Sequence, residues 1–178
     1  MRVLGVDPGS IKSGYGILDQ REAELIVLEY GVIRPTSDLP FAQRLLQISA
    51  RLQDLITQFQ PQVLAVEDLF FAKNVKSALK LGHARGVILV TAAQAGLEIA
   101  EYTPLEVKQA VVGYGRADKV QVQQMVKVLL HLKEIPTPDD AADALAIAIC
   151  HHHSAKMREQ IKRAVHPGNV NFIHFTRS

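Results

Sequence analysis

The sequence predicts an α/β fold in which a mixed five-stranded sheet is flanked by helices. Three strand-length apolar runs open the chain, and later runs of this length alternate with segments whose apolar residues recur every three or four positions. Consecutive strands favour antiparallel pairing, whereas strands separated by helices are typical of parallel pairing. With 178 residues, 48% of them hydrophobic, the chain has the size of one domain with a substantial core.

The three opening strands are expected at residues 2–7, 15–19 and 25–33. The first run, RVLGVD, ends at Asp7 and is followed by Pro8 and Gly9, which are typical turn residues. Polar residues 20–24 separate the second run from the third, as in a β-hairpin. We therefore expect these three strands to be antiparallel.

The rest of the chain predicts five helices and two strands. The helices are expected at residues 41–59, 74–95, 104–112, 118–130 and 139–148, and the strands at residues 62–67 and 97–102. The run QVLAVE at 62–67 is nearly all apolar, which is typical of a parallel strand buried on both faces. The helix from Asp139 is rich in alanine, which favours close packing and helix formation.

Composition and charge limit the class of protein. A single cysteine, Cys150, excludes a disulfide framework, and no apolar run approaches the roughly 18–20 residues of a membrane span. We therefore expect a soluble, cytoplasmic protein with no membrane partner. Between Lys73 and Lys133 there are nine basic and four acidic residues, whereas the first 72 residues are net acidic. This basic region is compatible with a phosphate backbone, although a solvated face is the more common reason for such a run.

Four acidic residues indicate a metal site. Asp7 and Glu67 end two predicted strands, and Asp140 and Asp143 lie three residues apart on one helix face. If that face meets the strand ends, the repulsion of four carboxylates requires cations, and Mg²⁺ prefers such oxygen ligands. Each acid alone has a simpler explanation as a turn or helix-cap residue. Asp143 resists that explanation, because it falls inside the helix among alanines.

Several motifs, in order, resemble the RuvC family of Holliday-junction endonucleases. They are GVDPGSIKSGYG at 5–16, AVEDLFFAKN at 65–74, SALKLGHARGV at 77–87, VKQAVVGYGRADKVQVQQMV at 107–126 and DAADALAIAICH at 140–151. The resemblance runs in register from about residue 1 to residue 153. It implies a ribonuclease-H-like nuclease domain, which we place at residues 1–155, followed by a basic C-terminal extension at 156–178.

The resemblance also implies an activity and its requirements. The family cuts four-way junction DNA by paired symmetric nicks, as a homodimer that uses Mg²⁺, with two ions expected per site and Mn²⁺ expected to substitute. The attacking group is water and the leaving group is a 3′-oxygen. The metal-binding acids of the family match Asp7, Glu67, Asp140 and Asp143. The expected protein partners are the branch-migration proteins RuvA and RuvB.

Further residues are expected to contact DNA or assist the reaction. Phe70 is expected to stack on an unpaired base at the crossover. The resemblance places Lys108 and Lys119 near the scissile phosphate, with Lys119 as a catalytic residue. Three other basic residues are expected either to bind phosphates or to lie over apolar surface, namely Lys76, Arg85 and Arg116. The run from Cys150 to His153 lacks the spacing of a zinc site and is expected to be a fraying helix end.

Three other functions remain open on the sequence alone. One is an RNA-processing nuclease of related fold, but such a protein is not expected to carry the LKLGHARGV and DAADAL segments. Another is an ATPase of the actin and sugar-kinase type, which needs a second domain and a second nucleotide loop, for which 178 residues leave little room. The third is a junction-binding subunit without catalysis, which would not need four acids.

Overall fold

The computed structural model describes the chain except for residues 10, 23, 69–74 and 166–178. Its elements are β1 (Arg2–Asp7), β2 (Ser13–Arg21), β3 (Glu24–Ile33), α1 (Phe41–Phe59), β4 (Val63–Glu67), α2 (Val75–Gln94), β5 (Glu98–Tyr102), α3 (Pro104–Val112), α4 (Lys119–Leu129) and α5 (Asp139–Val165). The order of strands and helices agrees with the prediction. The predicted fold class, a mixed sheet of five strands flanked by helices, is confirmed.

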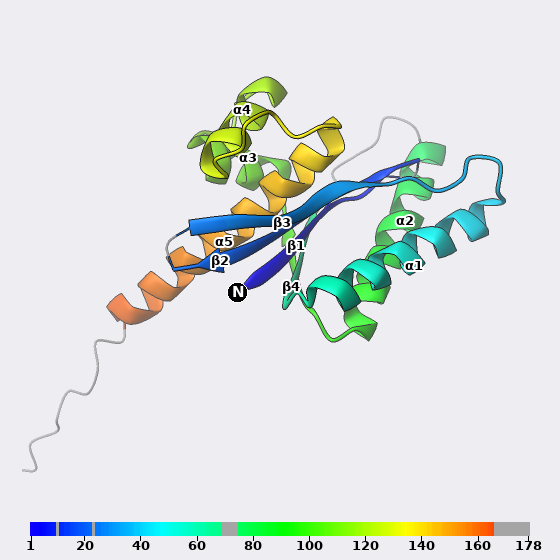
Figure 1. Ribbon diagram of the computed structural model, residues 1–178, viewed down its shortest axis with the longest axis horizontal. Coiled ribbons are helices and arrows are strands. Elements are labelled where there is room, and N and C mark those ends of the chain that lie inside the picture. Colours follow the sequence, from blue (N-terminus) through cyan, green and yellow to red (C-terminus); the bar gives the residue numbers. More distant parts are fainter. Residues whose placement is uncertain (10, 23, 69–74, 166–178) are drawn as a thin grey trace, which may run out of the picture.

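The strands form one sheet in the order β3-β2-β1-β4-β5. β1 pairs antiparallel with β2 and β2 pairs antiparallel with β3, whereas β4 is parallel to both β1 and β5. Figure 1 shows α1 and α2 on one side of this sheet, with α3, α4 and α5 on the other. The molecule therefore has three layers, with the sheet in the middle.

Alternation along the strands explains the two core regions. On β1, Val3 packs in the cluster that includes α3, α4 and α5, whereas Leu4 packs in the cluster that includes α1 and α2. On β4, Ala65 and Leu64 divide in the same way. Successive side chains of a strand point to opposite faces of the sheet, so both faces of these strands are buried. This explains why the runs are apolar throughout.

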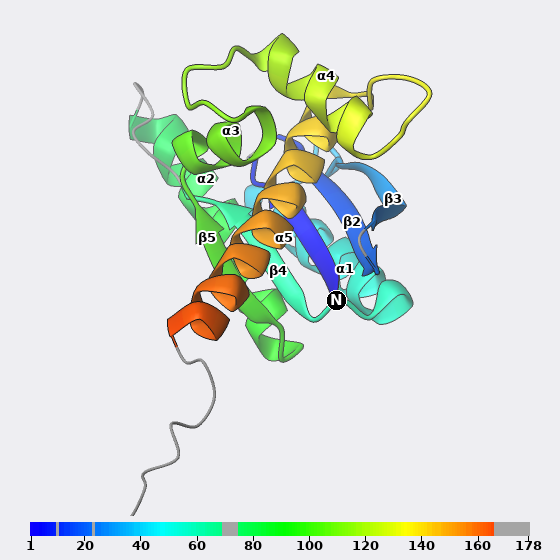
Figure 2. The ribbon, with the colours of Figure 1, turned by 90° about the vertical axis from the view of Figure 1, so that its left-hand side faces the viewer.

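Helix α5 lies across the sheet at close range (Figure 2), because glycines and alanines meet there. A Cβ atom added at Gly5 would lie 2.2 Å from the carbonyl oxygen of Ala144, and one added at Gly14 would lie 1.9 Å from that of Asp140. Only glycine fits such a contact without displacing the helix backbone. Gly5 and Gly14 of the segment GVDPGSIKSGYG therefore pack against the alanine-rich helix α5.

The prediction that Cys150–His153 is a fraying helix end is wrong. α5 continues to Val165, and Cys150, His151 and His152 are buried. The Nδ1 atom of His151 lies 2.9 Å from the hydroxyl of Tyr102, and burial lowers the pKa of His152 to about 4, with His151 contributing in the same direction. These histidines are core residues that hold the second half of α5 against the sheet. The helix also passes through residue 155 without a break.

None of the helices, over the residues that are described, is long and apolar enough to cross a membrane.

Candidate active site

Asp7 and Glu67 lie next to each other because their strands are parallel neighbours. Val6 of β1 is in register with Val66 of β4, and each acid is the next residue of its strand. Asp7 shares a strand face with Val3, and Glu67 shares one with Ala65, so alternation directs both carboxylates toward the layer of α3, α4 and α5. The prediction that the two acids meet at the carboxyl ends of these strands agrees with the structure.

Helix α5 adds Asp143 to the two strand acids. Asp7, Glu67 and Asp143 line one cavity of about 210 Å³, together with Lys108 of α3 and Lys119 of α4. Buried alanines on either side of Asp143, at positions 142 and 144, bring this part of the helix against the sheet. Five of the residues singled out in the sequence are therefore brought together at one place.

Asp140 is held differently, by a lysine that the sequence analysis did not single out. Its carboxylate forms an ion pair with the ammonium group of Lys12, and Asp140 is not among the residues that line the cavity. Lys12 could have been recognised from the hairpin of the first two strands, because Asp7 pairs with Gly14 and Lys12 lies in the turn between them. The turn between these residues must therefore lie at the same end of the sheet as the acids.

Lys119 partly neutralises the acids of α5. Its ammonium nitrogen lies 3.0 Å from a carboxylate oxygen of Asp143 and 3.4 Å from one of Asp139. Asp118 caps α4 by accepting a hydrogen bond from the backbone N–H of Gln121, which fixes Lys119 at the first turn of the helix. Burial lowers the pKa of Lys119, but the hydrogen bond and the charge of Asp143 outweigh it and raise the pKa overall.

Burial, together with the charges of neighbouring acids, raises the pKa values of three carboxylates at this site. Burial raises the pKa of Asp7 to about 7, and the charges of Glu67, Asp143 and Asp140 add to this effect. The pKa values of Glu67 and Asp143 are also raised, mainly by burial, although Lys108 opposes the change at Glu67 and Lys119 opposes it at Asp143. Excess negative charge of this kind favours binding of a cation.

The carboxylates at this site are ligands of the type that suits a hard divalent cation. Carboxylate oxygens are the ligands that Mg²⁺ prefers, and their uncompensated charge is what such an ion neutralises. Within the described part of the chain, however, no three His, Cys, Asp or Glu side chains form a ready-made metal site. Asp140 and Asp143 are instead paired with lysines. An ion bound here would replace those lysines as the partners of the two carboxylates.

The raised pKa of Asp7 predicts how the stability of the metal-free protein depends on pH. Because the folded-state pKa of about 7 exceeds the ordinary aspartate pKa of 3.8, ionisation of Asp7 destabilises the fold progressively between these pH values. Asp7→Asn should therefore stabilise the protein by roughly 2 kcal/mol at pH 8, a rise in Tm of several degrees, and by much less at pH 4.

Thermal unfolding in EDTA across this pH range would measure the difference. Asp54→Asn, a change of an exposed carboxylate on α1, serves as the control and should give no gain that grows with pH. A difference between wild type and Asp7→Asn that is the same at pH 4 and pH 8 would contradict the prediction.

The remaining basic residues predicted to contact DNA lie outside this cavity. Arg116 is exposed between α3 and α4, and Lys76 is exposed in the first turn of α2. Arg85, also on α2, forms ion pairs with Glu101 and Asp68. Phe70 lies outside the described residues, so its predicted contact with a base has no structural counterpart here.

The mixed five-stranded sheet, with carboxylates at the ends of two adjacent parallel strands, defines an α/β protein of the ribonuclease-H-like class. Residues 3–151 match the family model described as crossover junction endodeoxyribonuclease RuvC. The chain belongs to the RuvC family, as the motifs had indicated.

Two relatives and one solved structure agree with this assignment. Crossover junction endodeoxyribonuclease RuvC of Caldicellulosiruptor saccharolyticus is 55% identical over 152 residues, covering 85% of this chain and 92% of the relative. The protein of that name from Ruminiclostridium cellulolyticum is 51% identical over 157 residues, covering 88% and 95%. The structure of T. thermophilus RuvC in complex with a Holliday junction substrate has a TM-score of 0.85 and 39% identity, covering 89% of this chain and 96% of that one.

Proposed function

We propose that this protein is a metal-dependent endonuclease that resolves Holliday junctions by paired symmetric nicks, in DNA recombination and repair. The observation that carries the proposal is the cavity in which Asp7, Glu67 and Asp143 meet two lysines in a chain of the RuvC family. Hydrolysis of a phosphodiester needs a site that stabilises both the attacking water and the leaving 3′-oxygen. Carboxylates that bind cations, flanked by lysines, supply such a site.

The residues proposed to bind metal are Asp7, Glu67, Asp140 and Asp143. Two Mg²⁺ ions per site, for which Mn²⁺ would substitute, would stabilise the charge on the attacking and leaving oxygens. The chain's own part is to hold the carboxylates at the strand ends and on α5. Asp140 joins the other three acids when its carboxylate leaves Lys12, with which it is paired here.

Two lysines are proposed to act on the phosphate of the cleaved strand. Lys108 and Lys119 line the same cavity as the acids, and Lys119 is catalytic because its ammonium group stabilises charge that gathers on the reacting phosphate. This role requires Lys119 to exchange its present partners, Asp143 and Asp139, for phosphate oxygens. Lys76 and Arg116, both exposed, are proposed to contact the DNA backbone, and Phe70 to stack on a base at the crossover.

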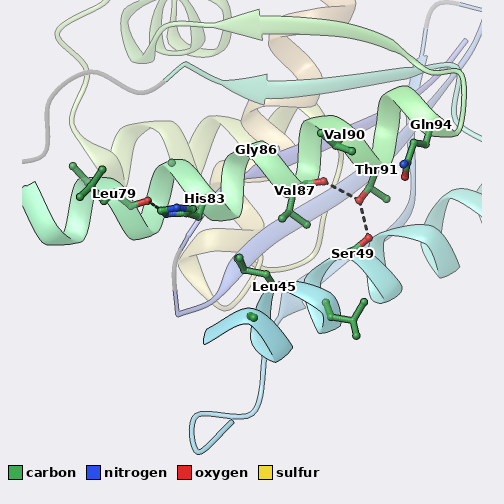
Figure 3. Close-up of a pocket in the computed structure, with 13 residues that line it drawn as sticks. Leu45, Ser49, Leu79, His83, Gly86, Val87, Val90, Thr91 and Gln94 are labelled. Carbon is green, nitrogen blue, oxygen red and sulfur yellow. Dashed lines mark hydrogen bonds between the residues drawn. The ribbon is translucent and has the colours of Figure 1, made fainter. Parts of the chain in front are cut away.

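A homodimer is proposed, with the groove between α1 and α2 as the contact surface. This groove has a volume of about 750 Å³, and Figure 3 shows Leu45, Leu79, Val87 and Val90 along it. Leu79 is 60% exposed and Val90 is 57% exposed, which is unfavourable for apolar side chains unless a partner covers them. Two protomers related by a two-fold axis would present two active sites to a junction of similar symmetry.

The dimer surface can be tested with a pair of matched substitutions. Val90→Asp should convert the dimer to monomer, because it would bury an unpaired charge in the proposed contact. Val128→Asp, at a valine of α4 that is 59% exposed, is the control and should leave the dimer intact. Analytical ultracentrifugation would decide between them. A dimer that survives Val90→Asp would exclude the groove as the contact.

The proposed activity is tested by presenting several DNA structures to the protein. A synthetic four-way junction should be nicked symmetrically in two opposed strands with Mg²⁺ and left intact with EDTA, whereas linear duplex and single-stranded DNA should stay uncut. Tight binding of the junction without cleavage would favour the alternative of a binding subunit. Equal cleavage of duplex and junction would contradict selectivity for branched DNA.

The cellular setting follows from the family. We propose RuvA and RuvB as functional partners and the cytoplasm as the compartment, with residues 1–155 as the nuclease domain and 156–178 as a basic extension. Co-purification of the protein with RuvA and RuvB on junction DNA would test the partnership.

A further inference from the structure

Arg85 is enclosed by groups that surround the end of β4. Its side chain is only 16% exposed, and its guanidinium pairs with the carboxylate of Glu101 on β5 and lies 3.6 Å from that of Asp68. Its Nε atom also donates a hydrogen bond of 3.4 Å to the backbone carbonyl of Glu67. One side chain of α2 therefore contacts β5, the residue after β4 and the backbone of a proposed metal-binding acid.

The backbone around Glu67 depends on these contacts. Glu67 is the last residue of β4, and the N–H of the next residue, Asp68, donates a hydrogen bond of 2.7 Å to the carbonyl of Tyr102 on β5. Arg85 contacts the same end of β4 from the helix layer opposite the cavity, since α2 and α5 lie on different faces of the sheet. It can thus fix the carboxylate of Glu67 without entering the cavity.

The charges near Arg85 disfavour contact with DNA. Its two partner carboxylates, Asp68 and Glu101, are 45% and 48% exposed, so they lie closer to solvent than the guanidinium. A phosphate that approached Arg85 would meet two negative groups against one positive group. The guanidinium would also have to give up hydrogen bonds made in a partly desolvated position, which are stronger than exposed ones.

We infer that Arg85 is a positioning residue for Glu67 and is not a contact to the DNA backbone. It acts through the carbonyl of Glu67 and through its pairs with Asp68 and Glu101, which together hold the end of β4 where its carboxylate faces Asp7. The inference rests on the proposed nuclease activity and identifies a residue on which that site depends. Residues that orient a metal ligand typically change metal affinity or activity by about 10- to 100-fold when they are replaced.

The test compares Arg85→Gln with Lys76→Gln, a change at a proposed phosphate contact on the same helix. Arg85→Gln should lower kcat at saturating junction about 10-fold or more and raise the Mg²⁺ concentration for half-maximal rate several-fold. Its junction affinity in EDTA, and the slope of that affinity against salt, should match wild type. Lys76→Gln should instead weaken junction binding and reduce the salt slope by about one.

Two further variants keep the test independent of folding. Glu101→Gln should lower kcat, as Arg85→Gln does, because it removes the charged partner of the guanidinium. If Arg85 instead contacted DNA, Glu101→Gln should tighten junction binding. Arg85→Lys should restore part of the lost rate. If Arg85→Gln weakens binding with a reduced salt slope and normal kcat, the inference fails. If the wild type itself does not cut the junction, the proposed function fails instead.

Discussion

Asp7→Asn is expected to lower junction cleavage about 1,000-fold or more while junction binding is retained. A bound cation contributes several kcal/mol of transition-state stabilisation, and each 1.36 kcal/mol corresponds to a factor of ten in rate. The charges of three other acids raise the pKa of Asp7, and its carboxylate lines the cavity with Glu67 and Asp143. An amide keeps the shape of the side chain but removes the charge that a cation requires. Single-turnover cleavage with Mg²⁺ would measure the loss.

Binding and a matched variant show whether that loss is specific. The affinity for a four-way junction in EDTA should be equal to wild type or higher, because one negative charge near the phosphates is gone. Asp54→Asn, on the exposed part of α1, should cut at the wild-type rate. Retention of cleavage by Asp7→Asn within tenfold of wild type would remove Asp7 from the proposed metal site. Loss of binding together with cleavage would indicate a damaged fold.

Much of the candidate site could be predicted from the sequence because it depends on local pattern. An apolar run that ends in an acid places a carboxylate at a strand end, and this holds for Asp7 and for Glu67. An acid between alanines in a helix is hard to explain by packing, and Asp143, between buried Ala142 and Ala144, lines the cavity. Strand alternation and helix periodicity then bring these three residues to one cavity. Two long-range contacts are needed as well: the pairing of β1 with β4 and the packing of α5 on the sheet.

Ion-pair partners could not be predicted in this way, because they are set by tertiary packing. Lys12 and Asp140 are separated by 128 positions in the chain, and their pairing depends on where α5 begins relative to β2. Arg85 lies in a basic part of the sequence, which suggested DNA binding. Only the placement of β5 beside β4 brings Glu101 to its guanidinium. The residues that support the site were therefore harder to recognise than those that form it.

The contact between α5 and the sheet leads to the second large effect. Gly14→Ala is expected to destabilise the fold by about 3 kcal/mol or more and to reduce cleavage over 100-fold. The new Cβ would lie 1.9 Å from the carbonyl oxygen of Asp140, which belongs to the helix backbone and has no rotamer by which to move away. The start of α5 must then shift from the sheet and carry Asp140 and Asp143 away from Asp7.

Gly16→Ala is the matched control, because it makes the same change on the same face of β2. There the nearest atoms, at 2.7 and 2.8 Å, belong to the side chain of Leu145, and its backbone nitrogen lies further away, at 3.1 Å. A smaller loss, of about 1–2 kcal/mol, and a smaller change in rate are therefore expected. Chemical denaturation and junction cleavage of both variants would rank them. Should Gly14→Ala prove as stable and active as Gly16→Ala, close backbone contact at Gly14 would not be what sets the position of the α5 acids.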